Sequence, residues 1–185
     1  MKRINDYLRY IPASEGPLSA DVYVIDGKQY YYVYDVGNNE TSRNALNDLP
    51  KEKIVILSHY HKDHTGNIGK INYNALYVGD LTYQTVGKGQ VVDGKLMIED
   101  GVRIEIQSCP SPHTDGSLIV TIDQEYTLIA DLYFTRTAEK NQKVTGMLEA
   151  LASIETRYFV VSHQDDTAIF EKQMFLKELN AHFGL

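Results

Sequence analysis

The sequence is poor in cysteine, lacks tryptophan and contains no long apolar run. Cys109 is the one cysteine among 185 residues, which excludes an intramolecular disulfide and leads us to expect a reducing, cytoplasmic environment. No stretch approaches the roughly 18 consecutive apolar residues of a transmembrane helix, so no membrane partner is expected. The basic start, Met1-Lys2-Arg3, has no apolar segment behind it, and we therefore expect no signal peptide.

Basic residues are also in short supply. The chain carries 18 Lys and Arg against 25 Asp and Glu, which gives a formal net charge of −7. Nucleic-acid binding depends on clustered basic side chains that displace counterions from phosphates, so no nucleic-acid partner is expected. No repeat, low-complexity tract or linker divides the sequence, and its 43% of hydrophobic residues is ordinary for a globular protein. We expect a single domain over residues 1–185.

Short runs of apolar and β-branched residues, separated by turn residues, dominate the chain. They predict strands over residues 20–25, 29–36, 54–57, 75–78, 95–99, 102–107, 117–122, 126–130 and 157–162. Asp26-Gly27 and Asp100-Gly101 predict hairpin turns. Helices are expected over residues 39–49 with Thr41 or Ser42 as N-cap, over 145–154, and over 166–183 behind an Asp/Thr cap. Many strands with few helices predict an α/β (α+β) architecture of two sheets with helices on their outer faces.

One segment concentrates the side chains that bind divalent cations. Ser58-His59-Tyr60-His61-Lys62-Asp63-His64 holds three of the six histidines and directly follows the strand predicted over residues 54–57. Imidazole and carboxylate are preferred ligands of cations such as Zn²⁺, and a strand that leads into a ligand-dense loop suits a catalytic metal site. The alternative is a solvated polar loop that happens to be rich in histidine. We favour the metal site.

Further potential ligands recur at the ends of predicted strands. His113 precedes one predicted strand in the sequence and His163 follows another. Asp35 and Asp131 lie at the ends of two others. Taken alone, each is a weak signal, because a strand-end Asp is usually a turn former and an isolated His is more often structural. Their recurrence at one end of several strands favours a shared site, and only His182 is expected to lie outside it.

The order of these residues resembles the signature of the metallo-β-lactamase superfamily, which reads His-x-His-x-Asp-His, then a distant His, a strand-end Asp and a last His. The matching residues are His59, His61, Asp63, His64, His113, Asp131 and His163, and Asp35 matches the family's early strand-end aspartate. The resemblance covers residues 20 to 165, nearly the whole domain. It implies a four-layer αβ/βα sandwich with two metals at one edge, between the sheets.

The resemblance also implies which residues bind which metal. His59, His61 and His113 would bind the first ion, Asp63, His64 and His163 the second, and Asp131 would bridge the two. The ions are expected to be zinc, with iron, manganese and cobalt as alternatives, because His/Asp sites accept all of these. Three neutral imidazoles leave the charge of a dication undiminished, which would acidify a bound water.

Other residues are expected to support this chemistry. Asp63 is the candidate catalytic residue, because it is placed to orient the nucleophile and to relay its proton. Asp35, Ser58, Thr114 and Ser162 are candidates for fixing the histidine tautomers. For the three hydroxyl residues, local backbone hydrogen bonding is an equally open alternative.

Departures from family patterns narrow the expected reaction. Pro112 stands where the family commonly has Gly, but it leaves the ligand His113 in place. Zinc β-lactamases of this fold often have Cys at the bridging position and a residue other than His at the end of the first motif. This chain has Asp131 and His64 there, so antibiotic hydrolysis is not favoured. Cys109 lies near this loop in sequence and is expected to be a buried structural thiol.

The spacing of the last ligands excludes larger relatives as models. The short segments after Asp131 and after His163 leave no room for the helical region of glyoxalase II-like thioesterases, for the insertions of nucleases or for a flavodoxin module. Flavodiiron-type proteins, moreover, usually carry Glu where His61 stands. A redox function is therefore not favoured.

We expect a binuclear metal-dependent hydrolase that uses a metal-bridging hydroxide to cleave a small ester, thioester, lactone or amide. The alternatives are a phosphodiester or phosphonate hydrolase of the same fold, and a non-catalytic metal-binding or sensor module. The segment Thr82–Gly94 is either a mobile flap over the metals or a plain connection between strands. Such segments shape the pocket, so the identity of the substrate does not follow from the sequence.

Overall fold

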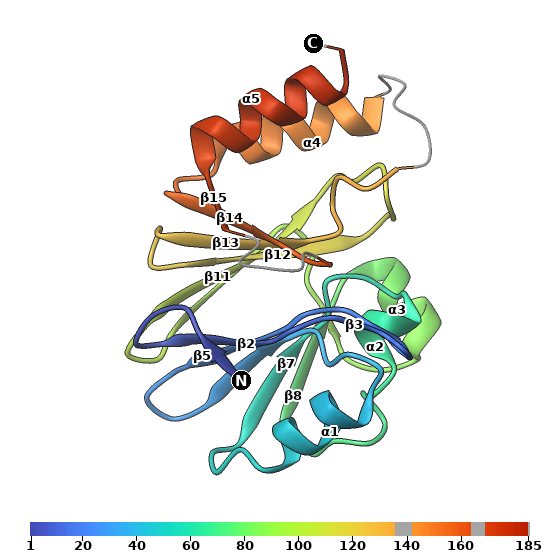
Figure 1. Ribbon diagram of the computed structural model, residues 1–185, viewed down its shortest axis with the longest axis vertical. Helices are drawn as coiled ribbons and strands as arrows, with labels where there is room; N and C mark the ends of the chain where they lie inside the picture. The colour runs from blue at the N-terminus through green and yellow to red at the C-terminus, as the bar shows by residue number, and fades with distance from the viewer. Residues whose placement is uncertain (136–141, 164–168, 185) are drawn as a thin grey trace.

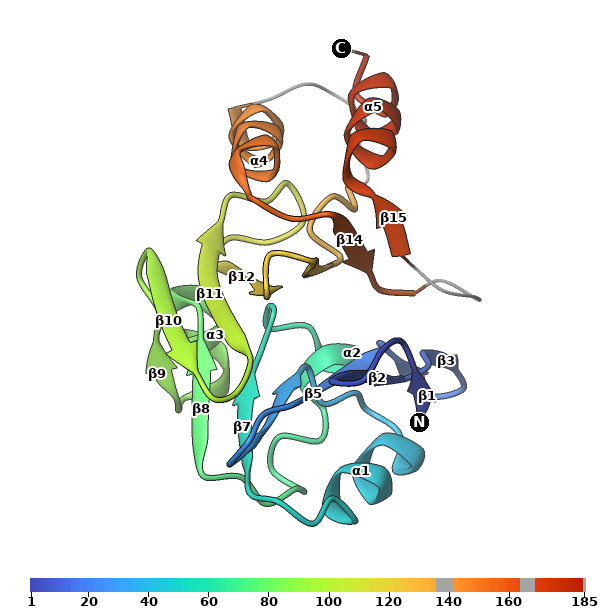
Figure 2. The same ribbon diagram turned by 90° about the vertical axis from the view of Figure 1, so that its left-hand side faces the viewer.

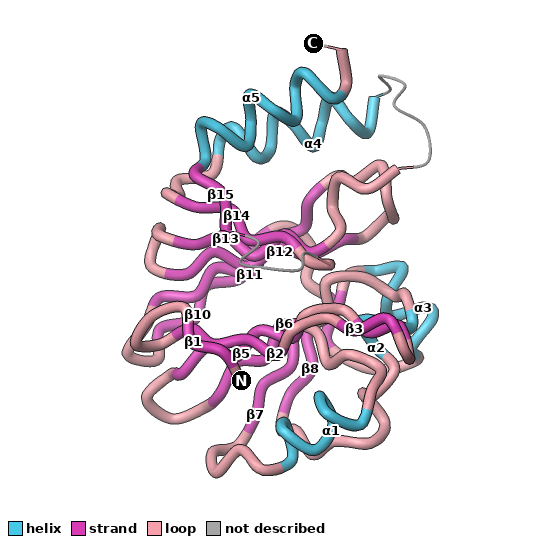
Figure 3. The backbone as a smooth tube through the Cα atoms, viewed as in Figure 1, coloured by secondary structure: helices cyan, strands magenta, loops and turns pink. Residues whose placement is uncertain are grey.

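The computed structural model describes residues 1–135, 142–163 and 169–184. Two β-sheets stack face to face, and helices cover the outer face of each sheet (Figure 1). Figure 3 shows the resulting order of the layers in space: helix, sheet, sheet, helix. The four-layer αβ/βα sandwich that we expected from the sequence is confirmed.

The first sheet has seven strands in the order β1-β2-β5-β6-β7-β8-β9. These strands are β1 (Lys2–Arg3), β2 (Leu8–Ile11), β5 (Val22–Asp26), β6 (Tyr31–Tyr34), β7 (Lys53–Ile56), β8 (Ala75–Val78) and β9 (Gln90–Val91). The strands from β1 to β6 pair antiparallel, and those from β6 to β9 pair parallel. A separate hairpin of β3 (Ser14–Glu15) and β4 (Leu18–Ser19) contacts the short helix α2 (Lys62–Thr65).

The second sheet has six strands in chain order, from β10 to β15. These are β10 (Lys95–Glu99), β11 (Arg103–Cys109), β12 (Ser117–Ile122), β13 (Tyr126–Ala130), β14 (Tyr158–Val161) and β15 (Ile169–Glu171). All neighbouring pairs are antiparallel except β13 and β14, which run parallel. A parallel pair needs a crossover connection, and helix α4 (Gln142–Ser153) lies in it.

The remaining helices are α1 (Glu40–Asn47), α3 (Asp80–Val86) and α5 (Lys172–His182). Figure 2 shows α4 and α5 on the outer side of the second sheet, with α1 at the opposite end of the molecule beyond the first sheet. Within the described residues, no helix is both long and apolar enough to cross a membrane.

Three apolar clusters fill the spaces between these layers. Period-two alternation in β6 illustrates how: Tyr32 and Tyr34 point into the cluster between the sheets, whereas Tyr31 and Val33 point into the cluster that also contains Leu46 of α1. Because both faces of the strand are covered, all four of its residues are buried. The tyrosines of this strand are therefore core residues.

Several elements differ from the sequence predictions. Helix α1 begins after Asn39, whose side chain accepts a hydrogen bond from Ser42 N at 2.7 Å, so the N-cap is neither Thr41 nor Ser42. Helix α5 begins at Lys172 rather than at residue 166, because the apolar residues before it form β15 and pair with β14. The Asp/Thr cap that we expected there lies outside the described residues.

The segment Thr82–Gly94, which we expected to be either a mobile flap or a plain connection between strands, contains regular secondary structure. Its first residues complete helix α3, which ends at Gly87 in a left-handed conformation (φ 74°). Gln90 and Val91 then form β9, which pairs with β8 at the edge of the first sheet. The backbone hydrogen bonds of α3 and β9 hold most of this segment. It therefore contributes one strand to the first sheet and one helix beside that sheet.

Candidate metal centre

The predicted site residues come together where strands of both sheets end at one edge. Asp35 follows β6, Asp131 follows β13 and His163 follows β14. Asp35, Ala130 and His163 have left-handed φ values of 61°, 45° and 60°. Such values are uncommon for residues other than glycine and collect at functional sites. The backbone turns abruptly at these strand ends, and the side chains that follow point toward one another.

The histidine-rich motif is held between the two sheets by backbone hydrogen bonds. His61 is the N-cap of α2, and its carbonyl accepts from His64 N at 3.1 Å. Asp63 and His64 therefore lie in the first turn of this helix. Leu118 N, in β12 of the second sheet, donates to the carbonyl of Ser58 at 2.8 Å. The motif loop is thus fixed to the sheet that supplies the other ligands.

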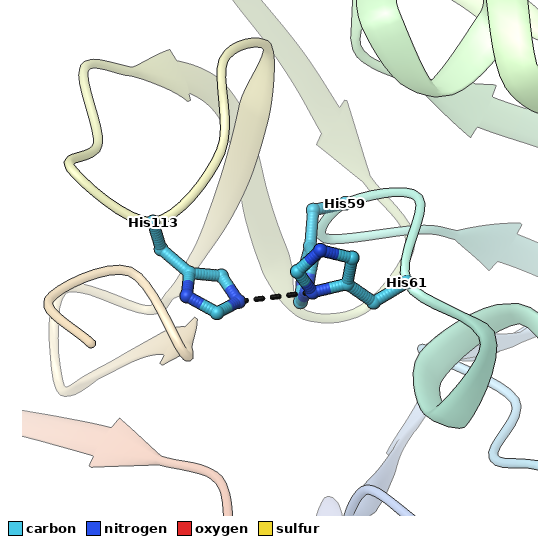
Figure 4. Close-up of side chains that lie close together, drawn as sticks. All are labelled: His59, His61 and His113. Carbon is cyan, nitrogen blue, oxygen red and sulfur yellow. Dashed lines mark hydrogen bonds between the residues drawn. The ribbon is translucent and has the colours of Figure 1, made fainter. Parts of the chain in front are cut away.

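The first cluster consists of His59, His61 and His113. His59 Nε2 and His113 Nε2 each lie 3.0 Å from His61 Nδ1. Figure 4 shows the His113 ring reaching from its own loop toward the two rings of the motif. The three rings come from two loops that are far apart in the sequence, so this convergence is a property of the fold.

Outward hydrogen bonds determine which nitrogen of each ring faces the cluster. His113 Nδ1 donates to the carbonyl of Phe134 at 3.0 Å. His59 Nδ1 lies 2.9 Å from Ser58 Oγ, whose own proton goes to Asp35 Oδ2 at 2.7 Å. Each of these two rings therefore carries its proton on Nδ1 and turns the lone pair of Nε2 inward, as metal-binding histidines do.

The second cluster consists of Asp63, His64, Asp131 and His163. His64 Nε2 lies 3.1 Å from Asp131 Oδ2, and His163 Nε2 lies 3.1 Å from Asp63 Oδ2 and 3.5 Å from Asp131 Oδ2. His64 Nδ1 binds Asp35 Oδ2 at 2.8 Å, so its proton is also held on the outer nitrogen. Asp131 Oδ2 is 3.9 Å from His113 Nε2, which places this carboxylate beside both clusters.

The two clusters have opposite electrostatic characters. Burial lowers the pKa of His59 to about 2 and also lowers the pKa of His61, so these imidazoles are neutral bases at physiological pH. Burial would lower the pKa of His64 too, but Asp35 and Asp131 outweigh it and raise the value to about 10. Hydrogen bonds to Asp131 and Asp63 raise the pKa of His163 to about 9.

The two carboxylates of the second cluster are correspondingly strong acids. Burial would raise the pKa of Asp131 and of Asp63, but hydrogen bonds and charge interactions with His163 and His64 outweigh it and hold both pKa values below the ordinary range. The carboxylates are therefore ionised near neutral pH and provide anionic oxygens to a cation.

The donor atoms fit cations better than they fit one another. His59 and His113 both present a lone pair to the single nitrogen His61 Nδ1, which can donate a proton to only one of them. Asp131 Oδ1 is buried and has no hydrogen-bond partner among the described residues. A buried, unpartnered carboxylate oxygen is costly unless a cation or water satisfies it. The two clusters are consistent with a binuclear metal site, as we expected from the sequence.

A pocket of about 530 Å³ opens beside the first cluster. It is lined by His61, Pro112, His113, Phe134 and Thr135. Its size falls within the range of about 300–1,000 Å³ that is usual for small-molecule sites. Two potential ligands form part of its wall, so a molecule in the pocket would lie directly against the cluster.

Two of the four predicted supporting residues contact histidine rings and two do not. Asp35 and Ser58 bind His64 and His59 as described above. The Thr114 hydroxyl instead lies 2.9 Å from Ser117 Oγ, a local contact within its own loop. The Ser162 hydroxyl contacts Asp21 at 3.3 Å. For these last two residues the observed contacts favour the alternative of hydrogen bonding to other groups over a role in fixing a tautomer.

The sequence interpretation missed two supporting groups. One is the Phe134 carbonyl that binds His113; a backbone carbonyl leaves no signal in the sequence. The other is Asp21, a buried carboxylate just before β5 that accepts a hydrogen bond from His163 N at 2.8 Å. The acidic residue inside an apolar strand pattern was a visible signal, but nothing local indicated its partner. Cys109 is buried and burial raises the pKa of its thiol to about 12, which agrees with a structural role.

Comparison with known proteins shows that part of the sequence matches a family model. Residues 16–74 match the family model described as the metallo-beta-lactamase superfamily. This segment includes Asp35 and the motif from His59 to His64, and it ends before His113. No curated protein matches the sequence.

Solved structures resemble nearly the whole chain. DIM-1 metallo-beta-lactamase has a TM-score of 0.73 at 14% identity, over 99% of this chain and 95% of its own. An archaeal metallo-beta-lactamase superfamily protein from Sulfolobus tokodaii has a TM-score of 0.70 at 16% identity, over 96% of this chain and 86% of its own. A mutant flavo di-iron protein from Thermotoga maritima has a TM-score of 0.65 at 11% identity, over 88% of this chain and 51% of its own. Lactamases and a di-iron protein share this fold, so the reaction must be argued from the site.

Proposed function

We propose that the chain is a member of the metallo-beta-lactamase superfamily and a binuclear metal-dependent hydrolase of a small ester, thioester, lactone or amide. One observation carries the proposal: seven nitrogen- and oxygen-bearing side chains converge in two clusters, with Asp131 beside both. His59, His61 and His113 would hold one divalent ion, and Asp63, His64 and His163 the other, with zinc as the expected metal. When bound there, two divalent cations lower the pKa of a water molecule and polarise the bond to be cleaved.

The residues of the chain have distinct roles in this proposal. The pKa values of His59 and His61 are lowered, which keeps their lone pairs available without proton loss. Asp63 is half-buried and ionised, and its Oδ2 faces His163. In that position it would orient the attacking water and accept its proton, the task of a general base.

The pocket beside His61 and His113 supports a small substrate. Phe134 and Pro112 supply apolar surface there, and the two histidines supply the polar wall. The open pocket also weighs against a non-catalytic metal-binding module, for which the metal edge would be expected to be covered.

The experiment is a measurement of bound metal together with turnover on a panel of thioesters, lactones, amides and bis(p-nitrophenyl) phosphate. We expect about two divalent ions per chain and turnover of one carbonyl substrate that falls at least about a hundredfold in Asp63→Ala. Asp115→Asn is the matched control, because Asp115 is an exposed carboxylate that pairs with Lys143 at 2.8 Å. This control should leave turnover unchanged.

The possible results separate the proposal from its alternatives. Fewer than two metals per chain, or turnover unaffected by Asp63→Ala, would contradict it. A preference for the phosphodiester over every carbonyl substrate would favour the phosphodiesterase alternative. Two bound metals without turnover of any substrate would favour a sensor module.

A further inference from the structure

Asp21 links the two sheets at the metal centre through a single carboxylate. Its Oδ2 accepts hydrogen bonds from His163 N at 2.8 Å and from Ser162 Oγ at 3.3 Å. Its Oδ1 accepts from Ala13 N at 3.0 Å, and its own main-chain N–H donates to Ser162 Oγ at 3.1 Å. The side chain is buried, so these four contacts replace water. The start of β5 is thereby joined to the end of β14.

His163 differs from three of the other histidines of the site in how its ring is held. The rings of His59, His64 and His113 are each fixed by a partner at the outer nitrogen Nδ1. Within the described part of the chain, the ring contacts of His163 are with the carboxylates of the second cluster and, edge to face, with the ring of His64. Its main chain has a φ of 60°, a left-handed conformation that is unfavourable for a residue other than glycine unless its surroundings hold it.

We propose that Asp21 is a positioning residue that holds the backbone and ring of His163 in the position needed for cation binding by the second cluster. This inference rests on the metal site proposed above and deepens it. The carboxylate accepts the N–H of the left-handed residue, and the ring of that residue then reaches Asp63 and Asp131. Without the acceptor, the His163 backbone is free to leave the left-handed region, which moves Nε2 away from both carboxylates. The first cluster has no contact with Asp21 among the described residues and should not respond.

Asp21→Asn tests this role with minimal change in shape. The amide has one acceptor oxygen where the carboxylate has two, so either His163 N–H or Ala13 N–H faces an NH₂ donor. The metal-free protein is titrated with Co²⁺ in competition with a chromophoric chelator, which yields the first and second dissociation constants. We expect the first constant to equal that of the wild type and the second to be about 10–100-fold weaker.

Asp100→Asn is the matched control. Asp100 is also buried, and its carboxylate also accepts two main-chain hydrogen bonds across the sheets, from Gln29 N at 2.9 Å and from Tyr30 N at 3.0 Å. It ties together two hairpin turns outside both clusters. The control should lower the resistance to thermal unfolding and leave both Co²⁺ constants at their wild-type values.

The outcomes distinguish this inference from the proposed function. A wild type that binds fewer than two Co²⁺ ions would refute the proposed function, and the inference with it. Two ions bound by Asp21→Asn with wild-type constants would refute the positioning role alone, as would equal weakening of both constants. If Asp21→Asn does not fold, Ser162→Ala takes its place, because it removes one of the donors to Asp21. A selectively weaker second constant is then expected, and an unchanged one overturns the inference.

Discussion

Asp35→Asn is the substitution that most directly tests how the histidines of this site are prepared for a cation. Asp35 is buried; its Oδ2 contacts His64 Nδ1 at 2.8 Å and Ser58 Oγ at 2.7 Å, and its Oδ1 accepts from Ser58 N at 2.8 Å. Its φ of 61° is one that Asn adopts as readily as Asp. The backbone is therefore undisturbed, and the change is limited to one charge and one acceptor.

The size of the effect follows from these contacts. A cation at His64 Nε2 leaves the single proton of the ring on Nδ1, where the carboxylate accepts it. With Asn, one orientation of the amide turns an NH₂ donor toward that proton, and the other turns it toward Ser58 N–H. Either way a buried donor loses its acceptor. We expect second-cluster affinity to fall about 10–100-fold. The metal-free protein should lose about 1.5–3 kcal/mol of stability, the usual contribution of a hydrogen bond to a charged group.

The assay combines chelator competition with urea denaturation in the presence of EDTA, with Asp115→Asn as the control for a lost charge at the surface. The expected pattern is a weaker second dissociation constant, a smaller weakening of the first constant through Ser58 and His59, and a lower unfolding midpoint. If Asp35→Asn binds both ions as tightly as the wild type, the argument from tautomers is wrong. If stability is also unchanged, the contacts of Asp35 do not have the energetic role assigned to them.

Three further predictions concern packing and pH. A Cβ on Gly79 would lie 1.7 Å from the Gly116 carbonyl oxygen, so Gly79→Ala should cost at least about 1–3 kcal/mol in the unfolding free energy and shift the loop that carries His113. Gly146→Ala, in the interior of α4 with its nearest contact at 3.4 Å, should be neutral or stabilising by up to about 1 kcal/mol; equal costs for the two variants would contradict this. The raised pKa values of His64 and His163, about 10 and about 9, mean that a cation must displace a proton from each, so the second Co²⁺ constant should strengthen with pH and level off only above about 9 to 10. The same raised pKa values stabilise the metal-free protein, and this contribution is fully present below about pH 6.5. Denaturation at several pH values should show the contribution disappearing as the pH rises through 9 to 10. An unfolding free energy that does not change over this range would contradict the prediction.

The parts of the fold that were predicted well depend on local patterns. The strands over residues 75–78, 95–99, 117–122 and 126–130 match the predicted bounds because alternating or continuous apolar residues are bounded by turn residues. The motif from His59 to His64 was visible for the same reason, since all its ligands lie within one loop and one helical turn. The fold then brought His113, Asp131 and His163 to it, as the family resemblance implied.

The parts that were missed depend on partners distant in sequence. Ile169 and Phe170 continue the apolar stripe of α5, yet they pair with β14 as a strand, and only the neighbouring strand decides this. Helix α3 has few apolar residues and depends on its packing against the loop that contains Gly116, so its sequence resembles a connection. Asp21 acts on His163, which lies 142 residues later, and no local pattern can reveal such a contact.

The most direct test of the central claim is anomalous diffraction from crystals of the metal-loaded protein, recorded across the Zn and Fe absorption edges. Two anomalous peaks are expected. One should lie among the nitrogens of His59, His61 and His113, and the other should lie among the donor atoms of the second cluster, with Asp131 in contact with both. A single peak elsewhere, or no peak at either cluster in protein that contains metal, would contradict the assignment of these seven residues.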